Sequence, residues 1–291
     1  MTCPVHPDWD RAGADWPNRE ASQFLQVGRV RWHYQRMGQG PVLLLLHGTG
    51  AATHSWRDMM PLLAEKFDVI ALDLPGHGFT RIQSRRQCSL PAMGGAIAEF
   101  LKALDLQPNM LIGHSAGTAI ALRSVLSDGV STERVIGFNP ALTPFRGVAG
   151  VVFPPLAKLL ALNPFVPWMF ASLPGSRTQA RRLIDSTGSN IDARGHALYA
   201  RLFTRSDHVD GALAMMALWD LDPLLKALPN LDTPIDLYVG EGDQMVPPKE
   251  AIGLGRTIDR ITTHKVPSLG HLMHEEEPQT FADIIKDVAC G

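Results

Sequence analysis

The sequence predicts an α/β protein, in which a mostly parallel β-sheet carries helices on both faces and a helical cap is inserted between its strands. Short apolar runs alternate with segments of helical periodicity along residues 42–138, and the alternation resumes from residue 235. Between these parts the alternation stops and the chain is unusually apolar. We therefore expect a core made of residues 1–141 and 226–291 and a cap made of residues 142–225.

Composition narrows the class of protein. The 291 residues are 45% hydrophobic and 19% charged, which is typical of a globular protein with a sizeable core, and the formal net charge of -2 gives no basic surface for nucleic acid. The three cysteines are odd in number and far apart, which argues against a disulfide framework or a zinc site. The first twenty residues are polar and contain no apolar signal segment, so we expect a cytoplasmic protein without cofactor or metal.

The elements follow one another in a regular order. Residues 1–20 are expected to form an irregular arm over the body, and residues 24–37 a hairpin with its turn at Gly28, since apolar and polar residues alternate from residue 30 to 35. The apolar run at 42–46 predicts a strand buried on both faces. Further strands are predicted at 69–72, 109–112, 134–138, 235–239 and 261–266, and helices at 55–67, 90–104, after residue 115 and at 281–288.

A G-x-S-x-G sequence, residues 113–117, lies between the strand ending at residue 112 and a helix of small residues. A serine on a sharp strand-to-helix turn has a strained backbone that pushes its hydroxyl out of the sheet, and its neighbours two positions away must be small. The five-residue pattern alone is common by chance, but its position between a strand and a helix makes Ser115 a candidate nucleophile.

Three polar residues follow the ends of predicted parallel strands. These are His47, Ser115 and Asn139. Ligands of such sheets bind outside the carboxyl ends of the strands, so the positions agree with a site at this edge.

The loop His47-Gly48-Thr49-Gly50 follows the strand at 42–46. A backbone N–H from this loop can point at the serine turn, and we assign the oxyanion hole to the N–H groups of Thr49 and Ala116. Taken alone, the glycines would favour the simpler interpretation, a turn that leads into a helix. The presence of Ser115 favours the oxyanion role.

An imidazole is the usual base for a serine nucleophile. His271 follows Gly270 after the last strand and is the preferred base, whereas His274, followed by Glu275–Glu277, is expected to begin a solvated helix. His271 and His274 have the spacing of metal ligands, but no third ligand is apparent. Asp73 and His77 are explained by a tight turn.

The imidazole needs a carboxylate that fixes its tautomer. Asp243 lies after the strand at 235–239, and the chain order Ser115, Asp243, His271 is that expected for a serine turn of this kind. Asp236 lies inside the strand, Glu241 comes too early, and the other acid position, after residue 138, holds Asn139. Asp243 is therefore the acid by elimination.

The most apolar part of the cap, residues 151–173, is interrupted by four prolines and lacks an unbroken membrane-spanning stretch. We expect a helical cap that roofs an apolar pocket, with simple core packing and shallow contact with a membrane surface as alternatives. The predicted pocket residues are His47, Gly48, His114, Asn139, Phe145, Trp168, Met215 and Trp219.

Taken together, residues 113–117, His47-Gly48, residues 73–78, Asp243 and Gly270-His271 resemble the α/β-hydrolase superfamily. Longer strings, at 36–41 through 47–51, 137–145 and 215–220, are similar to the BchO type, proteins associated with magnesium chelatase in bacteriochlorophyll biosynthesis. This resemblance covers nearly the whole chain. It implies the α/β-hydrolase fold, a photosynthetic bacterium, a link to porphyrin metallation and contact with the chelatase, but it supplies no reaction.

Within the superfamily, haloalkane dehalogenases and most epoxide hydrolases carry aspartate where this chain has Ser115, so the serine argues against both. The expected reaction is hydrolysis of an ester, thioester or amide through an acyl-enzyme, on an apolar small molecule such as a porphyrin or its ester. Hydrolysis of a carbon–carbon bond would use the same residues. The alternative is a non-catalytic protein that binds a porphyrin or assists the chelatase, because the fold does not decide between these functions.

Overall fold

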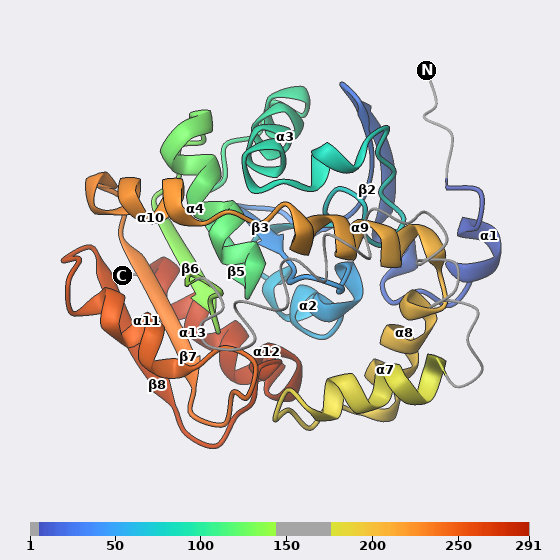
Figure 1. The fold of residues 1–291 in the computed structure, drawn as a ribbon. Helices are drawn as coiled ribbons and strands as arrows, with labels where there is room; N and C mark the ends of the chain where they lie inside the picture. The colour runs from blue at the N-terminus through green and yellow to red at the C-terminus, as the bar shows by residue number, and fades with distance from the viewer. Residues whose placement is uncertain (1–5, 144–175, 291) are drawn as a thin grey trace.

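The computed structural model describes residues 6–143 and 176–290. Its centre is an eight-stranded sheet in the order β1-β2-β4-β3-β5-β6-β7-β8 (Figure 1). The pairs β1–β2 and β2–β4 are antiparallel, and every other neighbouring pair is parallel. The prediction of a mostly parallel sheet is confirmed. The strands are β1 Ser22–Val27, β2 Val30–Met37, β3 Val42–Leu46, β4 Asp68–Leu72, β5 Met110–His114, β6 Arg134–Phe138, β7 Ile235–Gly240 and β8 Ile261–Val266.

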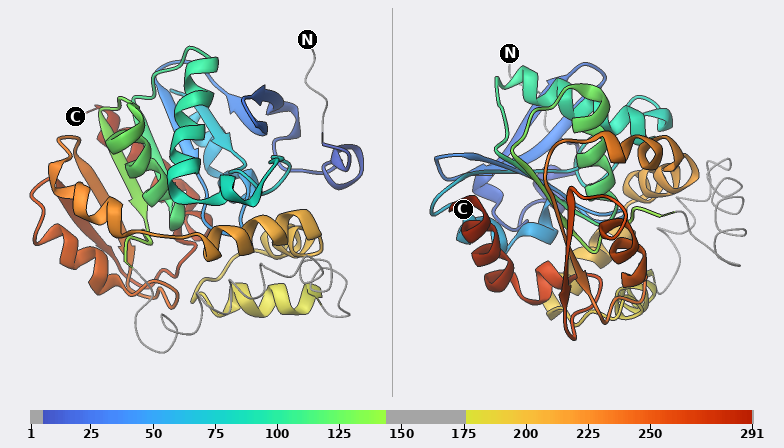
Figure 2. Two further views of the ribbon diagram at one scale, coloured as in Figure 1. Left: turned by 45° about the horizontal axis from the view of Figure 1, so that its top comes forward. Right: turned by 90° about the vertical axis from the view of Figure 1, so that its left-hand side faces the viewer.

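Helices cover both faces of the sheet, as the right-hand view of Figure 2 shows. Alternate residues of β3 belong to two separate hydrophobic clusters: Leu44 and Leu46 pack in one, Leu43 and Leu45 in the other. A strand whose side chains are apolar on both faces reads as a continuous apolar run, which explains the sequence at residues 42–46. On the first face lie α3 (Leu90–Ala103), α4 (Ala116–Asp128), α10 (Asp222–Ala227) and α11 (Pro248–Gly255), and on the second α2 (Met59–Leu63) and α13 (Pro278–Cys290).

One sequence prediction about local structure is corrected here. The single helix expected at 55–67 is a 3₁₀ turn at Thr53–Trp56 followed by α2, Met59–Leu63. Pro61 lies in the first turn of α2, where its missing N–H is not needed. In β2 the polar residues His33 and Gln35 are as fully buried as the apolar ones, because the N-terminal arm covers their face.

That arm carries α1 (Trp9–Ala12) and a 3₁₀ turn at Arg19–Ala21. Trp9 and Trp16 are buried in a cluster with Phe79 and two leucines of α8 (Ala193–Phe203). The arm therefore lies over the body, as predicted, and contacts the segment that follows the undescribed residues.

We call α7 (Ser176–Asp185), α8 (Ala193–Phe203) and α9 (Ser206–Ala217) the cap helices. They lie together across one end of the sheet (Figure 2, left). No strand interrupts them within residues 176–217. The division of the chain into a core and a cap at residues 141 and 226 stays a prediction.

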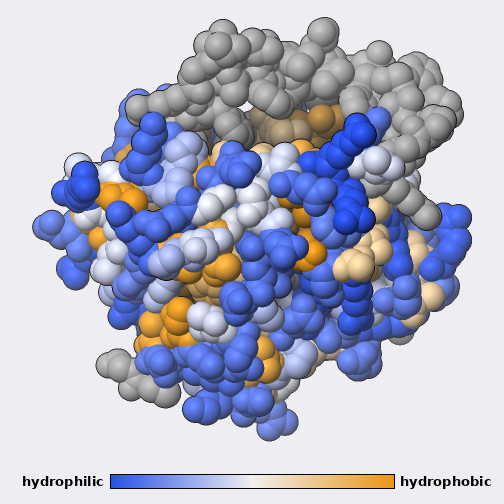
Figure 3. Space-filling model, turned by 90° about the horizontal axis from the view of Figure 1, so that it is seen from below, coloured by the Kyte–Doolittle hydropathy of each residue, from blue (hydrophilic) through white to orange (hydrophobic). Residues whose placement is uncertain are grey.

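The surface of the cap side is mixed. In Figure 3 hydrophobic residues lie in separate places among hydrophilic ones. Among residues 6–143 and 176–290, no helix has the length and apolar character needed to cross a membrane. The apolar stretch predicted not to span a membrane, 151–173, lies outside the described residues.

Candidate active site

Ser115 lies on the turn between β5 and α4 with φ 52° and ψ −117°. A positive φ is strained for a residue with a side chain, and such strain is found where a side chain must be presented in one orientation. The turn is fixed to the neighbouring strand because the Ser115 N–H donates to the Phe138 carbonyl at 2.9 Å and its carbonyl accepts from the Ala141 N–H at 3.1 Å. The serine is therefore held at the carboxyl ends of β5 and β6.

The two glycines of the G-x-S-x-G sequence are required by close packing. A Cβ at Gly113 would lie 2.4 Å from the Thr118 nitrogen, and one at Gly117 would lie 2.1 Å from the Leu46 carbonyl oxygen. Neither contact is compatible with a side chain. The expected reason for small neighbours on both sides of Ser115 is thus present in the structure.

The loop after β3 packs directly on the serine. A Cβ at Gly48 would lie 3.1 Å from the Ser115 Cβ. The Leu74 N–H donates to His47 Nε2 at 2.9 Å, so Nδ1 carries the proton of the neutral ring and donates to the Gly48 carbonyl at 2.7 Å. Because the carbonyl of Gly48 and the N–H of Thr49 belong to one trans peptide, this hydrogen bond also fixes the direction of the Thr49 N–H.

A histidine from the cap holds the same loop. His208 of α9 accepts from the Gly78 N–H at Nδ1, at 3.0 Å, and therefore donates from Nε2 to the Gly50 carbonyl, at 3.1 Å. Burial lowers the pKa of both His47 and His208 to about 4, so both rings are neutral near pH 7. Sequence reasoning missed His208, because nothing in its spacing relates it to the loop at residues 47–50.

Asp243 and His271 form a buried pair. Asp243 Oδ2 lies 2.7 Å from His271 Nδ1. The other carboxylate oxygen accepts from the N–H groups of Met245 and Val246, at 2.7 and 2.9 Å. The side chain of Asp243 is fully buried and that of His271 is 10% exposed. The carboxylate thus fixes the tautomer of His271, with Nδ1 protonated and Nε2 free to accept a proton.

His271 and Ser115 lie at the same edge of the sheet. The ring of His114, the residue before the serine, is 4.8 Å from the ring of His271, and its Nε2–H donates to the His271 carbonyl at 2.9 Å. The hydrogen bonds found among the described residues do not include one between the Ser115 and His271 side chains. Such bonds are often long in free hydrolases and shorten when substrate binds.

His274 differs from the prediction. The helix α12 (Met273–Glu276) that contains it is not solvated: His274 is fully buried among the rings of Trp56, His114 and Phe138. Burial lowers its pKa to about 3. A histidine that stays neutral and enclosed in this way is a packing residue, which agrees with the preference for His271 as base.

The turn after β4 has the structural role that was predicted. The buried carboxylate of Asp73 accepts three hydrogen bonds of 2.7 Å, from the N–H groups of Thr53 and Phe79 and from His33 Nδ1. These bonds join the turn to the 3₁₀ segment Thr53–Trp56 and to β2, and close the turn at Phe79. The ring of His77, in the same turn, is also fully buried.

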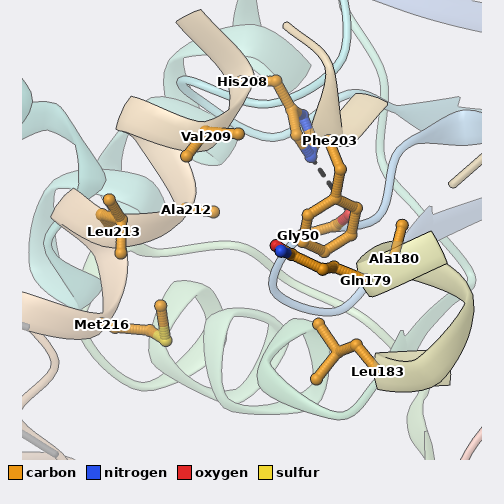
Figure 4. A pocket seen from close by; sticks show the side chains of 10 residues that line it. All are labelled: Gly50, Gln179, Ala180, Leu183, Phe203, His208, Val209, Ala212, Leu213 and Met216. Carbon is orange, nitrogen blue, oxygen red and sulfur yellow. Dashed lines mark hydrogen bonds between the residues drawn. The ribbon is translucent and has the colours of Figure 1, made fainter. Parts of the chain in front are cut away.

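An apolar cavity of about 240 Å³ lies between α7 and α9, beside the loop that contains Gly50. Figure 4 shows Gln179, Ala180 and Leu183 of α7 opposite the side chains of α9, with His208 hydrogen-bonded to Gly50 at one end. The lining residues are Gly50, Gln179, Ala180, Leu183, Phe203, His208, Val209, Ala212, Leu213 and Met216.

This lining differs from the predicted pocket. Met215 is buried in the main hydrophobic cluster, and Trp219 packs at the edge of that cluster. Met216, the next residue in the chain, lines the cavity instead. His47, His114 and Asn139 are buried: His47 bonds the loop after β3, and the other two bond the loop of His271. Gly48 packs on Ser115. Phe145 and Trp168 lie outside the described residues. No cluster of three potential metal ligands occurs in the described part of the chain.

Residues 43–284 match the alpha/beta hydrolase family. The chain belongs to this family. It is 42% identical over 276 residues, 94% of this chain and 96% of the relative, to the magnesium-chelatase 30 kDa subunit of Rhodobacter capsulatus. This similarity confirms the predicted resemblance to the BchO type. The chain is also 26% identical over 289 residues, 92% of this chain and 93% of the relative, to 2-hydroxymuconate semialdehyde hydrolase of Pseudomonas sp. strain CF600.

Solved structures agree on the fold of this α/β-hydrolase. An esterase from Exiguobacterium antarcticum superposes with a TM-score of 0.76 at 18% identity, covering 92% of this chain and 99% of that one. At such identity the likeness concerns the architecture alone.

Proposed function

We propose that the protein is a serine hydrolase that cleaves an ester, thioester or amide bond through an acyl-enzyme. The observation that carries the proposal is the 2.7 Å hydrogen bond between buried Asp243 and His271, at the sheet edge where Ser115 lies on a strained turn. This combination of an oriented imidazole and a presented serine is the arrangement that nucleophilic catalysis requires.

In the proposed reaction, Ser115 Oγ attacks the carbonyl carbon of the substrate while His271 Nε2 takes the hydroxyl proton. The carbonyl oxygen becomes an oxyanion. When the tetrahedral intermediate collapses, the bond to the leaving group breaks and His271 returns the proton to that group. Water then attacks the acyl-serine by the same steps, with His271 as base, and releases the acid and free Ser115. Asp243 stabilises the imidazolium form of His271 in both halves.

The oxyanion would be held by the N–H groups of Thr49 and Ala116. Ala116 is the first residue of α4, so its N–H has no carbonyl partner within the helix, and the positive end of the helix dipole lies there. The Thr49 N–H is oriented by the bond between His47 and Gly48. Fixed donors of this kind need no rearrangement as charge develops, which is the source of their catalytic effect.

The substrate would have an apolar group next to its scissile carbonyl. The cavity between α7 and α9 begins at Gly50, next to Thr49, and its walls are mostly aliphatic or aromatic. The cavity volume of about 240 Å³ exceeds what a two-carbon acetyl group occupies, and burying each further methylene contributes about 0.8 kcal/mol. We therefore expect medium-chain acyl groups to be preferred over acetyl.

The test is hydrolysis of p-nitrophenyl esters of increasing acyl length by the wild type and by Ser115→Ala. We expect measurable turnover by the wild type and a loss of at least about a thousandfold in the variant. Folded wild-type protein that hydrolyses no ester, thioester or amide in such a panel would contradict the proposal.

A second candidate function follows from the relative of 42% identity, which is a magnesium-chelatase subunit. In this alternative the chain contacts a magnesium chelatase and uses its apolar cavity to bind a porphyrin or its ester, without catalysis. Absorbance titration with a porphyrin and complementation of a deletion strain with Ser115→Ala separate the two. Full complementation by Ser115→Ala together with a porphyrin spectrum that shifts on binding would favour the accessory role, whereas failed complementation by a folded variant favours the hydrolase.

A further inference from the structure

The segment that joins α7 to α8 passes between the two loops that carry Asp243 and His271. We call residues Thr187, Gly188 and Ser189 the cap turn. Gly188 has φ +80°, and a Cβ there would lie 2.2 Å from the Gly242 carbonyl oxygen. A Cβ at Gly270 would lie 2.4 Å from the Gly188 carbonyl carbon. The cap turn is therefore packed against the residue before Asp243 on one side and the residue before His271 on the other.

Hydrogen bonds connect the cap turn to both loops. The Thr187 carbonyl accepts from the Gln244 N–H at 3.2 Å and from the His271 N–H at 3.3 Å. The Ser189 hydroxyl accepts from the Leu272 N–H at 2.7 Å. The Thr187 carbonyl thus joins Gln244, the residue after Asp243, to His271. The Ser189 hydroxyl holds Leu272, the residue after His271.

Two glutamates add to this connection from the His271 side. Glu276 accepts from the Gly270 N–H at 2.9 Å and from the Asn190 N–H at 3.0 Å, one with each carboxylate oxygen. Glu275 accepts from the Tyr199 hydroxyl of α8 at 2.7 Å and pairs with Arg57. The His271 loop is thus fastened to the cap before and after the imidazole.

These contacts bear on the acid–base pair because Asp243 and His271 come from different loops. β7 and β8 pair with each other, and the Gly242 N–H donates to the Leu269 carbonyl at 2.9 Å, but these contacts come before Asp243 and His271 in the chain. The cap turn supplies the hydrogen bonds at His271 and just after each of the two residues, and Thr187 and Ser189 are only 5% and 8% exposed. We propose that the cap turn is a positioning element that holds the two loops at the spacing required by the bond between Asp243 Oδ2 and His271 Nδ1. This inference rests on the proposed function in so far as it assigns His271 as the base.

The decisive variant is Ser189→Ala, which removes the acceptor of the Leu272 N–H and leaves the packing nearly unchanged. Its matched control is Ser186→Ala, because Ser186 lies three residues earlier, is exposed, and its hydroxyl donates to the Leu183 carbonyl of its own helix. We expect Ser189→Ala to lower kcat on a p-nitrophenyl ester about tenfold with little change in KM, since a small displacement of a catalytic group costs much of its rate. Ser186→Ala should keep the wild-type kcat, and Ser189→Thr, which restores a hydroxyl, should recover most of it.

A second readout does not depend on activity. The Nδ1 proton of a histidine bonded to a buried carboxylate gives a proton resonance far downfield of the amides, which is assigned by its loss in His271→Gln. In Ser189→Ala, and in Glu276→Ala as a second variant, this resonance should broaden and exchange faster with solvent, while Ser186→Ala leaves it sharp. An unchanged resonance in folded Ser189→Ala and Glu276→Ala overturns the inference whether or not the protein hydrolyses esters. If the wild type shows the resonance, Ser189→Ala and Glu276→Ala broaden it, and the wild type hydrolyses no ester, only the proposed function is overturned.

Discussion

The side-chain nitrogen of Asn139 lies 3.0 Å from the main-chain oxygen of His271 and 2.8 Å from that of Gly270. Its side-chain oxygen accepts from the Gly240 N–H at 2.7 Å. Asn139 therefore joins the end of β6 to the loop of the candidate base and to the end of β7. It lies at the second place where a carboxylate could have stood, and it has a structural role there.

Replacing Asn139 by alanine should destabilise the protein strongly. The change removes three hydrogen bonds and leaves the buried N–H of Gly240 without an acceptor, and we expect a loss of about 2–4 kcal/mol in the free energy of unfolding. The positive φ of 43° adds to the loss, because asparagine tolerates this conformation better than alanine. Urea denaturation measures the change, with Asn230→Ala at an exposed position as control. A stability within 0.5 kcal/mol of wild type, roughly the range of surface substitutions, would refute this role.

The two candidate bases should respond differently to substitution. His274→Phe keeps an aromatic ring among Trp56, His114 and Phe138, so we expect it to retain most of the wild-type kcat on a p-nitrophenyl ester. His271→Ala should lose about a thousandfold or more. Steady-state kinetics with both variants decide the matter. If His274→Phe were the inactive one, the assignment of the base would be wrong.

Buried histidines should make the fold sensitive to acid. Their pKa values are lowered in the folded state by burial, so the folded protein keeps them neutral while the unfolded chain takes up protons below about pH 6.5. Stability is therefore lost as the pH falls from 6.5 towards 4, by about 1.4 kcal/mol per pH unit for each such histidine. The pKa is lowered to about 4 in His47 and His208, to about 3 in His274, and well below the usual value in His54, His77 and His114.

Denaturant unfolding at pH 8, 6.5 and 5 measures this dependence. His274→Phe removes one of these groups. The slope of its unfolding free energy against pH should therefore be smaller than that of the wild type by about 1.4 kcal/mol per pH unit, the contribution of one proton. An equal slope in the variant and the wild type between pH 6.5 and 5 would show that His274 is protonated in the folded state.

The cavity predicts a dependence on acyl length. Ala212 lines it from α9, and Ala212→Phe should fill much of its volume. We expect kcat/KM for p-nitrophenyl octanoate to fall by about tenfold or more while that for the acetate changes little, because only the longer chain needs the cavity. Ala217→Phe, the same change on the same helix outside the lining, is the control. An equal loss of kcat/KM for both esters would show that the acyl group does not bind in this cavity.

The sheet and the contact between Asp243 and His271 could be predicted from the sequence because their signals are local. The predicted strand at 42–46 is observed as Val42–Leu46, and the one at 134–138 as Arg134–Phe138. Both are apolar runs buried on two faces, for which pattern and structure coincide. Asp243 and His271, chosen as neighbours of strand ends, do lie 2.7 Å apart, since parallel strands bring their carboxyl ends to one edge.

The cap could not be predicted in the same way. Met215 and Met216 differ by about 100° around the helix axis, and only packing between helices decides which of them faces the cavity. The charged residues after His274 suggested a solvated helix, but Glu275 is buried against Arg57, which is 218 residues away in the chain. Partners at such separation leave no periodic signal in either segment.

The proposed hydrolysis depends most on Ser115 being an activated nucleophile. Intact-protein mass spectrometry after treatment with a fluorophosphonate tests this directly, because the probe reacts covalently with a serine that a base has activated. We predict one adduct per wild-type chain, mapped to the peptide that contains Ser115, and no adduct on folded Ser115→Ala or His271→Ala. A folded wild type that stays unmodified, or one modified equally in Ser115→Ala, would contradict the central claim.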